Sequence, residues 1–163
     1  MHKEVMEFLR ETKRKFPNNF KNIKVAEFGS LNINGSPREL FENCNYVGID
    51  WRHGKDVDIV SIGHNVELPE HSFDTVISCE MLEHDKHAPK SIWKMLKLLK
   101  KNGLLILTMA GEDRLKHEIE CGIDNHYKNI SPNDLLGWIE LNFCKEFHCK
   151  YTGKDIYFLG IIR

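Results

Sequence analysis

The fold of this chain is decided by the stretch Val25-Ala26-Glu27-Phe28-Gly29-Ser30-Leu31-Asn32-Ile33-Asn34-Gly35, followed by Tyr46-Val47-Gly48-Ile49-Asp50. Two short apolar runs each carry an acid at or near their end, Glu27 in the first and Asp50 in the second. A glycine-containing loop separates the runs and would let a ligand approach bare backbone. This order predicts a strand, a loop and a second strand, and it is typical of sites for an adenosine-containing ligand.

Helical signals lie on both sides of this stretch. Apolar residues recur at near-helical spacing among lysines, glutamates and arginines from about 3 to 15, which predicts an amphipathic helix ended by Pro17. Ser36-Pro37-Arg38-Glu39 has the form of a capping box with proline at the first helical position, so a helix is expected just after Gly35. Ser131-Pro132 repeats that signature and predicts another helix through Ile139.

Further strands and helices alternate along the remaining chain. Strands are expected at 57–60, 73–79 and 104–109, with an amphipathic helix over 89–101 and a final hairpin from 143–151 and 156–162. Alternation of this kind predicts an α/β fold with helices on both faces of the sheet. We expect a single doubly wound, mostly parallel seven-stranded sheet with a C-terminal antiparallel hairpin, whose ligand site lies at the carboxyl ends of the strands.

Length and composition fit one ordinary globular domain. The 163 residues are predicted to form a single domain, with a helix and linker over 1–22 and a cofactor-binding core over 23–163. A net charge of -1 gives no indication of nucleic acid as a partner. No apolar run approaches the roughly 20 residues of a membrane span, and no secretory signal is recognisable, so a cytoplasmic protein with reduced cysteines is expected.

Four blocks in order resemble the class I S-adenosylmethionine-dependent methyltransferases, over about 24–162. The first two are the acid-x-glycine of Glu27-x-Gly29 and the run Val47-Gly48-Ile49-Asp50. The third is Leu68-Pro69-x-x-Ser72-Phe73-Asp74-x-Val76, and the fourth joins Leu82-Glu83-His84 to Leu98-Leu99-Lys100-x-x-Gly103-Leu104-Leu105. The last block is similar to that of the small-molecule methyltransferase branch. The resemblance implies a Rossmann-like methyltransferase fold and S-adenosylmethionine as cofactor.

The resemblance also implies which residues bind that cofactor. Asp50 would accept both ribose hydroxyls, and Gly29 would let the backbone approach the methionine portion. Trp51, Gly63 and His64 would contact the adenine. The full implied set is Glu27, Phe28, Gly29, Ser30, Asn32, Gly35, Asp50, Trp51, Gly63, His64, Cys79 and Glu80.

The residues that handle the acceptor carry weaker signals. Glu80 and His84 are candidate proton acceptors, although methyl transfer can proceed largely by positioning. His126 and Tyr127, in the polar segment after the fifth core strand, are candidate substrate contacts. His117, Cys121 and His126 fit no common zinc spacing, so no metal site is predicted.

The chain also departs from the family pattern. Leu31 and Ile33 stand where further glycines are usual, and Ile62 stands where many relatives carry an acid for the adenine amino group.

The leading hypothesis is methyl transfer to a small-molecule acceptor. The alternatives are a non-catalytic S-adenosylmethionine-binding or regulatory partner with a degenerate site, and a fold relic that binds nothing. A nicotinamide-dependent dehydrogenase would need glycines at G-x-G-x-x-G spacing, which this loop lacks. A homo-oligomer or a partner subunit is a further possibility.

Overall fold

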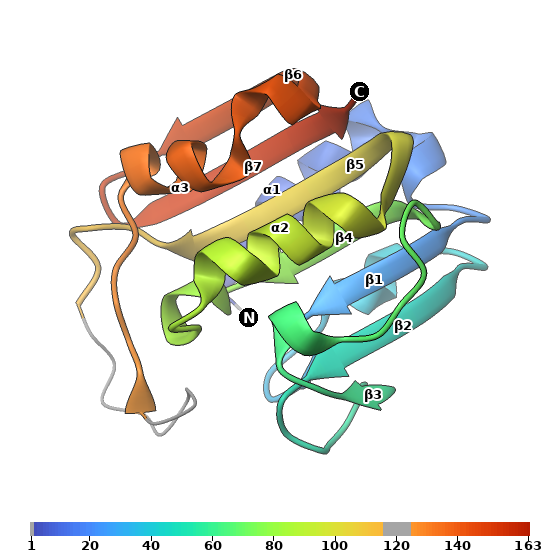
Figure 1. The fold of residues 1–163 in the computed structure, drawn as a ribbon, viewed down its shortest axis with the longest axis horizontal. Coiled ribbons are helices and arrows are strands. Elements are labelled where there is room, and N and C mark those ends of the chain that lie inside the picture. Colours follow the sequence, from blue (N-terminus) through green and yellow to red (C-terminus); the bar gives the residue numbers. More distant parts are fainter. Residues whose placement is uncertain (1, 116–124) are drawn as a thin grey trace.

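The computed structural model describes residues 2–115 and 125–163. These residues form a seven-stranded sheet in the order β3-β2-β1-β4-β5-β7-β6 (Figure 1). The strands are β1 (Lys24–Phe28), β2 (Asn45–Asp50), β3 (Ile59–Val60), β4 (Phe73–Cys79), β5 (Leu99–Ala110), β6 (Cys144–Tyr151) and β7 (Asp155–Ile162). Because the strand order reverses between β1 and β4, the carboxyl ends of these two strands flank the natural ligand crevice of such a sheet.

The pairing directions agree with the sequence prediction. The pairs β1–β2, β1–β4, β2–β3 and β4–β5 are parallel, whereas β7 runs antiparallel to both β5 and β6. The predicted α/β fold, a mostly parallel seven-stranded sheet with a C-terminal antiparallel hairpin, is confirmed. Of the predicted strand 57–60, only Ile59–Val60 pairs, because Val57 N closes a turn on the carbonyl of Gly54.

Helices cover both faces of this sheet. Helix α1 (Lys3–Lys15) buries Val5 and Leu9 in one cluster, which includes Val25 and Ile77 of the sheet. Helices α2 (Ala88–Leu98) and α3 (Pro132–Ile139) contribute to a second cluster on the other face. In Figure 1, α2 and α3 lie in front of the sheet and α1 lies behind it. The predicted helix over 89–101 ends at Leu98, because Leu99 already pairs with Phe73 of β4.

The prediction of an α-helix after Gly35 is wrong. The chain forms only a four-residue 3-10 helix, Pro37–Leu40, in which the Ser36 hydroxyl accepts from Arg38 N at 3.1 Å. Phe41 then takes an extended conformation and stacks on the buried ring of Phe20, with ring centroids 4.5 Å apart. Packing of the partly buried Phe41 ring on Phe20 therefore overrides the local helical signal.

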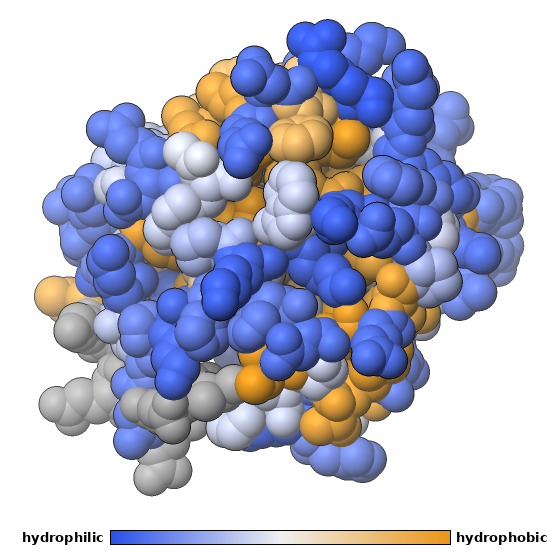
Figure 2. Space-filling view, in the orientation of Figure 1, coloured by the Kyte–Doolittle hydropathy of each residue, from blue (hydrophilic) through white to orange (hydrophobic). Residues whose placement is uncertain are grey.

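Charged and polar side chains dominate the face that α2 and α3 form, with hydrophobic atoms visible between them (Figure 2). The Trp93 side chain of α2 is 42% exposed there and its ring packs against Phe143. Within the described ranges, no helix is both long and apolar enough to span a bilayer.

Candidate functional site

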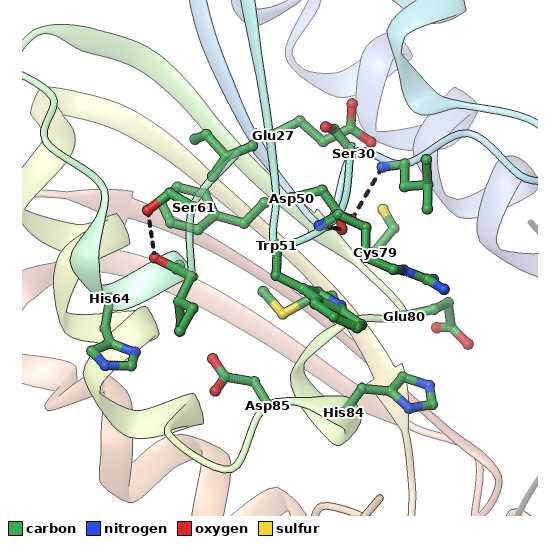
Figure 3. A pocket seen from close by; sticks show the side chains of 18 of the residues that line it. Glu27, Ser30, Asp50, Trp51, Ser61, His64, Cys79, Glu80, His84 and Asp85 are labelled. Atoms are coloured by element: carbon green, nitrogen blue, oxygen red, sulfur yellow. Dashed lines mark hydrogen bonds between the residues drawn. The ribbon is translucent and has the colours of Figure 1, made fainter. Parts of the chain in front are cut away.

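A cavity of about 480 Å³ opens at the carboxyl ends of β1, β2 and β4. It lies where the strand order reverses, which is the place expected for a ligand site in an open α/β sheet. Figure 3 shows side chains from β1, β2, β4 and the loops after them converging on this space. The structure brings together all of the implied cofactor residues except Asn32: Glu27, Phe28, Gly29, Ser30, Gly35, Asp50, Trp51, Gly63, His64, Cys79 and Glu80.

The glycine loop follows directly from β1. Gly29 has φ of 80°, and a Cβ added there would lie 2.6 Å from the Cβ of Met81, so only glycine fits. The amides of Gly29 and Ser30 donate to the carbonyl of Ile49 at 2.8 and 3.1 Å, which ties the loop to β2. The buried Ser30 hydroxyl has no hydrogen-bond partner among the described residues. A buried polar atom of this kind at a cavity wall suits a polar ligand.

The carboxylate of Asp50 is held at the end of β2 by two backbone amides. Leu31 N donates to its Oδ2 at 3.3 Å and Arg52 N donates to its Oδ1 at 2.9 Å. Each carboxylate oxygen can accept more than one hydrogen bond, so both retain capacity for a ligand. The neighbouring Trp51 ring lines the same cavity, with the Arg52 guanidinium 5.0 Å from its centroid. Asp50 is therefore oriented before any ligand arrives.

The buried Glu27 and the partly buried Cys79 form the floor of the cavity between β1 and β4. Glu27 is 2% exposed, and its Oε2 accepts from the hydroxyl of Tyr46 at 3.0 Å. Burial raises the pKa of Glu27 to about 8, with the Tyr46 hydrogen bond acting in the opposite direction. Burial also raises the pKa of the Cys79 thiol well above its usual range, and Glu27 adds to that effect. Burial therefore favours the neutral form of both groups.

Glu80 lines the cavity, but its carboxylate is already engaged. Thr108 Oγ1 donates to its Oε1 at 3.0 Å, and the Arg114 guanidinium is paired with its Oε2. A second terminal nitrogen of Arg114 lies 3.2 Å from Asp155 Oδ1. This network joins the ends of β4, β5 and β7, so the structure places Glu80 in an ion pair rather than as a free base.

Glu83 is a second buried acid on the same side. Glu83 is only 2% exposed, and its carboxylate oxygen Oε2 has no hydrogen-bond partner among the described residues. Burial raises the pKa of Glu83 to about 8, and the nearby charge of Glu80 adds to this effect. Glu83 does not line the cavity, and the sequence analysis placed it only in the block Leu82-Glu83-His84, with no role of its own.

The predicted acceptor residues separate into two places. His84 lines the cavity, and its ring packs edge-on against that of Tyr127 with centroids 5.0 Å apart. His126 and Tyr127 do not line the cavity, although Lys128 N donates to the carbonyl of Glu83 at 2.8 Å and holds their segment beside it. His117 and Cys121 lie outside the described residues. The described residues contain no group of three side chains suited to holding a metal ion.

Asn32 organises the loop instead of facing the cavity. Its side-chain nitrogen donates to Asp56 Oδ2 at 2.6 Å, and its side-chain oxygen accepts from Gly35 N at 2.9 Å. The lining residues that sequence reasoning did not assign to the cofactor site are Leu31, Ile33, Asn34, Ile49, Arg52, Ser61, Ile62, Met81, Asp85, Lys86 and His87. Several are direct neighbours of predicted residues, which is the one signal that could have found them. The same signal applies to Asp85 and His87, which follow the predicted His84 in the polar segment between β4 and α2.

Comparison with known proteins identifies relatives of this architecture. Residues 35–107 match the methyltransferase domain family. No curated protein sequence matches the chain significantly.

Solved structures share the fold along nearly the whole chain. A 1,6-didemethyltoxoflavin N1-methyltransferase from Burkholderia thailandensis, solved with S-adenosylhomocysteine, has a TM-score of 0.69 at 11% identity, covering 95% of this chain and 78% of its own. A SAM-dependent methyltransferase from Aquifex aeolicus has a TM-score of 0.66 at 12% identity, with 95% and 89% covered. Phosphoethanolamine N-methyltransferase 2 from Haemonchus contortus has a TM-score of 0.70 at 13% identity, and the match covers 96% of this chain and 52% of that one. The chain therefore resembles the class I S-adenosylmethionine-dependent methyltransferases in sequence and in fold, with a methyltransferase domain matched over residues 35–107.

Proposed function

We propose that this protein transfers a methyl group from S-adenosylmethionine to a small-molecule acceptor. One observation carries the proposal: Gly29, Ser30 and Asp50 converge on a single cavity at the point where the strand order reverses. The two relatives named for their substrates, a didemethyltoxoflavin methyltransferase and a phosphoethanolamine methyltransferase, act on small molecules by their names. That shared fold supports a small acceptor here.

The residues present fit such a cofactor. Asp50 would accept the two ribose hydroxyls with the lone pairs that Leu31 N and Arg52 N leave available. The backbone around Gly29, which no Cβ shields, would face the methionine portion, and Glu27 would face its amino group. Trp51 and His64 would then flank the adenine.

S-adenosylmethionine, when bound, supplies a methyl group on a positively charged sulfur. The protein's own contribution is to hold an acceptor atom in line with that carbon and to keep water away, and positioning alone can account for a large part of such a rate. The Glu80 carboxylate is paired with Arg114 and Thr108. We therefore assign the role of proton acceptor to His84, because its imidazole lines the cavity and is a group that takes up protons near neutral pH.

Calorimetric titration with S-adenosylmethionine and S-adenosylhomocysteine tests the proposal. We expect both to bind, nicotinamide adenine dinucleotide not to compete, and Asp50→Ala to weaken affinity by at least about tenfold. Asp134→Ala is the matched control, since Asp134 is exposed on α3, and its affinity should equal that of the wild type. Absence of binding by the folded wild type would contradict the proposal.

Turnover separates an enzyme from a cofactor-binding partner protein. Incubation with S-adenosylmethionine and a panel of small amines, hydroxyl compounds and carbon acids should yield S-adenosylhomocysteine and one methylated product. Tight cofactor binding without turnover of any acceptor would instead favour the non-catalytic alternative, for which Ile62 in place of an acid is the motivating observation.

A further inference from the structure

One end of the cavity is the place for the adenine of the proposed cofactor, and Ile62 is part of the wall at that end. If Asp50 binds the ribose, the adenine lies toward β3, because Ser61 N donates to the carbonyl of Asp50 at 2.9 Å and residues 61–65 line the cavity beyond it. Ile62 offers no side-chain acceptor on this wall. The exocyclic amino group of adenine is a hydrogen-bond donor, and a buried donor without an acceptor is costly.

We propose that Asp85 accepts the hydrogen bond of the adenine amino group and thereby selects adenosine over 6-oxopurine nucleosides. This inference rests on the proposed cofactor. Asp85 lies between the 3-10 helix Leu82–His84 and α2, and it lines the cavity. In Figure 3 its carboxylate points into the open space between His64 and the Trp51 ring.

Contacts from the N-terminal end of α2 and the preceding His87 hold the Asp85 carboxylate in this orientation. His87 N donates to its Oδ1 at 2.7 Å, and the Ser91 hydroxyl donates to its Oδ2. Each oxygen has about two lone-pair positions, so these bonds leave an acceptor site on both. A carboxylate fixed by its own scaffold loses little freedom when it binds a ligand.

Ser91 and His87, the two residues that bind Asp85, also lie against the wall formed by residues 61–65. A Cβ added to Gly63 would lie 2.9 Å from Ser91 Oγ, the same hydroxyl that binds Asp85. The His64 and His87 rings meet edge-on with centroids 4.8 Å apart. The buried His64 Nδ1 has no hydrogen-bond partner among the described residues, which is a second polar position for a purine edge on this wall.

The chemistry predicts a specific discrimination. A carboxylate attracts the amino group of adenine but repels the carbonyl oxygen that replaces it in hypoxanthine. A site built to bind a donor rejects the analogue that lacks it, because the buried acceptor is then left unpaired. In an asparagine variant the side-chain amide can accept or donate, so this preference should disappear.

Calorimetric affinities for S-adenosylhomocysteine and S-inosylhomocysteine, with wild type and Asp85→Asn, test the inference. The wild type should prefer the adenosyl ligand by at least about tenfold, and in Asp85→Asn the ratio should fall close to one. Asparagine keeps an oxygen for the His87 amide, so α2 should fold, which circular dichroism checks. Asp134→Asn, an identical change on the exposed surface of α3, should leave the ratio at the wild-type value.

The outcomes separate this inference from the proposed function. A wild-type ratio near one, or a ratio that persists in Asp85→Asn, overturns the role of Asp85 while adenosyl binding still supports the proposed cofactor. The wild-type ratio needs no variant, so misfolding of Asp85→Asn could not protect the inference. Failure of the folded wild type to bind either ligand overturns both.

Discussion

The guanidinium of Arg114 is paired with the carboxylate of Glu80, across 34 positions of sequence. Both side chains are largely buried, at 12% and 17% exposure, and Arg114 also reaches Asp155 at the start of β7. The acid that closes β4 therefore anchors the segment that follows β5. The network of Glu80, Thr108, Arg114 and Asp155 therefore holds the Glu80 carboxylate in its position at the cavity.

Arg114→Ala should destabilise the fold by about 3 kcal/mol, because it leaves Glu80 and Asp155 without their shared cation in a poorly solvated place. Urea denaturation followed by circular dichroism measures the change. Arg14→Ala, whose side chain is 76% exposed, should shift stability by no more than about 0.5 kcal/mol. Equal effects of the two variants would refute the anchoring role.

Gly29→Ala should lower stability by about 1–3 kcal/mol and abolish cofactor binding, because alanine at φ of 80° is strained and its Cβ meets Met81 at 2.6 Å. Gly137→Ala is a control for which the opposite change in stability is expected. Nothing lies within 4 Å of a Cβ there and the residue is inside α3, so alanine should stabilise by about 0.5–1 kcal/mol. Thermal melts of both variants measure the two changes in stability, and a titration with S-adenosylhomocysteine measures the loss of binding in Gly29→Ala.

Asn32→Asp should weaken S-adenosylhomocysteine affinity more than Asn32→Ala, although Asn32 does not line the cavity. Alanine removes the bond to Asp56, at a cost of about 1 kcal/mol, whereas aspartate keeps the acceptor for Gly35 N but sets two carboxylates against each other. Calorimetry ranks the affinities. Asn142→Asp, an exposed site, serves as the control. If Asn32→Ala were the weaker binder, a loop-positioning role would be excluded in favour of direct cofactor contact.

Stability should fall as pH rises from about 5 to 8, because burial raises the pKa of Glu27 and of Glu83 to about 8. In that window the folded state holds protons that the unfolded state has released, and each such proton costs up to about 1.4 kcal/mol per pH unit. Glu27→Gln keeps an acceptor for Tyr46 and should flatten this slope. Urea midpoints at four pH values measure it, and Glu146→Gln on the exposed face of β6 should retain the wild-type slope. A slope of the opposite sign would show that Glu27 is ionised in the folded protein.

Local chemistry explains which elements the sequence predicted correctly. The cap before α3 is confirmed, since Ser131 Oγ accepts from Asp134 N at 3.0 Å, three residues away. The same signature at Ser36 produced only a short 3-10 helix, because the ring of Phe41 stacks on that of Phe20, 21 positions earlier in the chain. A capping pattern contains its own partners, whereas a stacking partner from another segment leaves no mark in the pattern.

The sequence by itself determined the strand, glycine loop and acid around Glu27, Gly29 and Asp50, because these features depend on residues close together in the chain. Only the tertiary structure decided that Glu80 is paired with Arg114 and that Asp85 faces the cavity. Those contacts exist because parallel strands bring their carboxyl ends to one edge of the sheet, and the loops that follow them meet there whatever their separation in sequence.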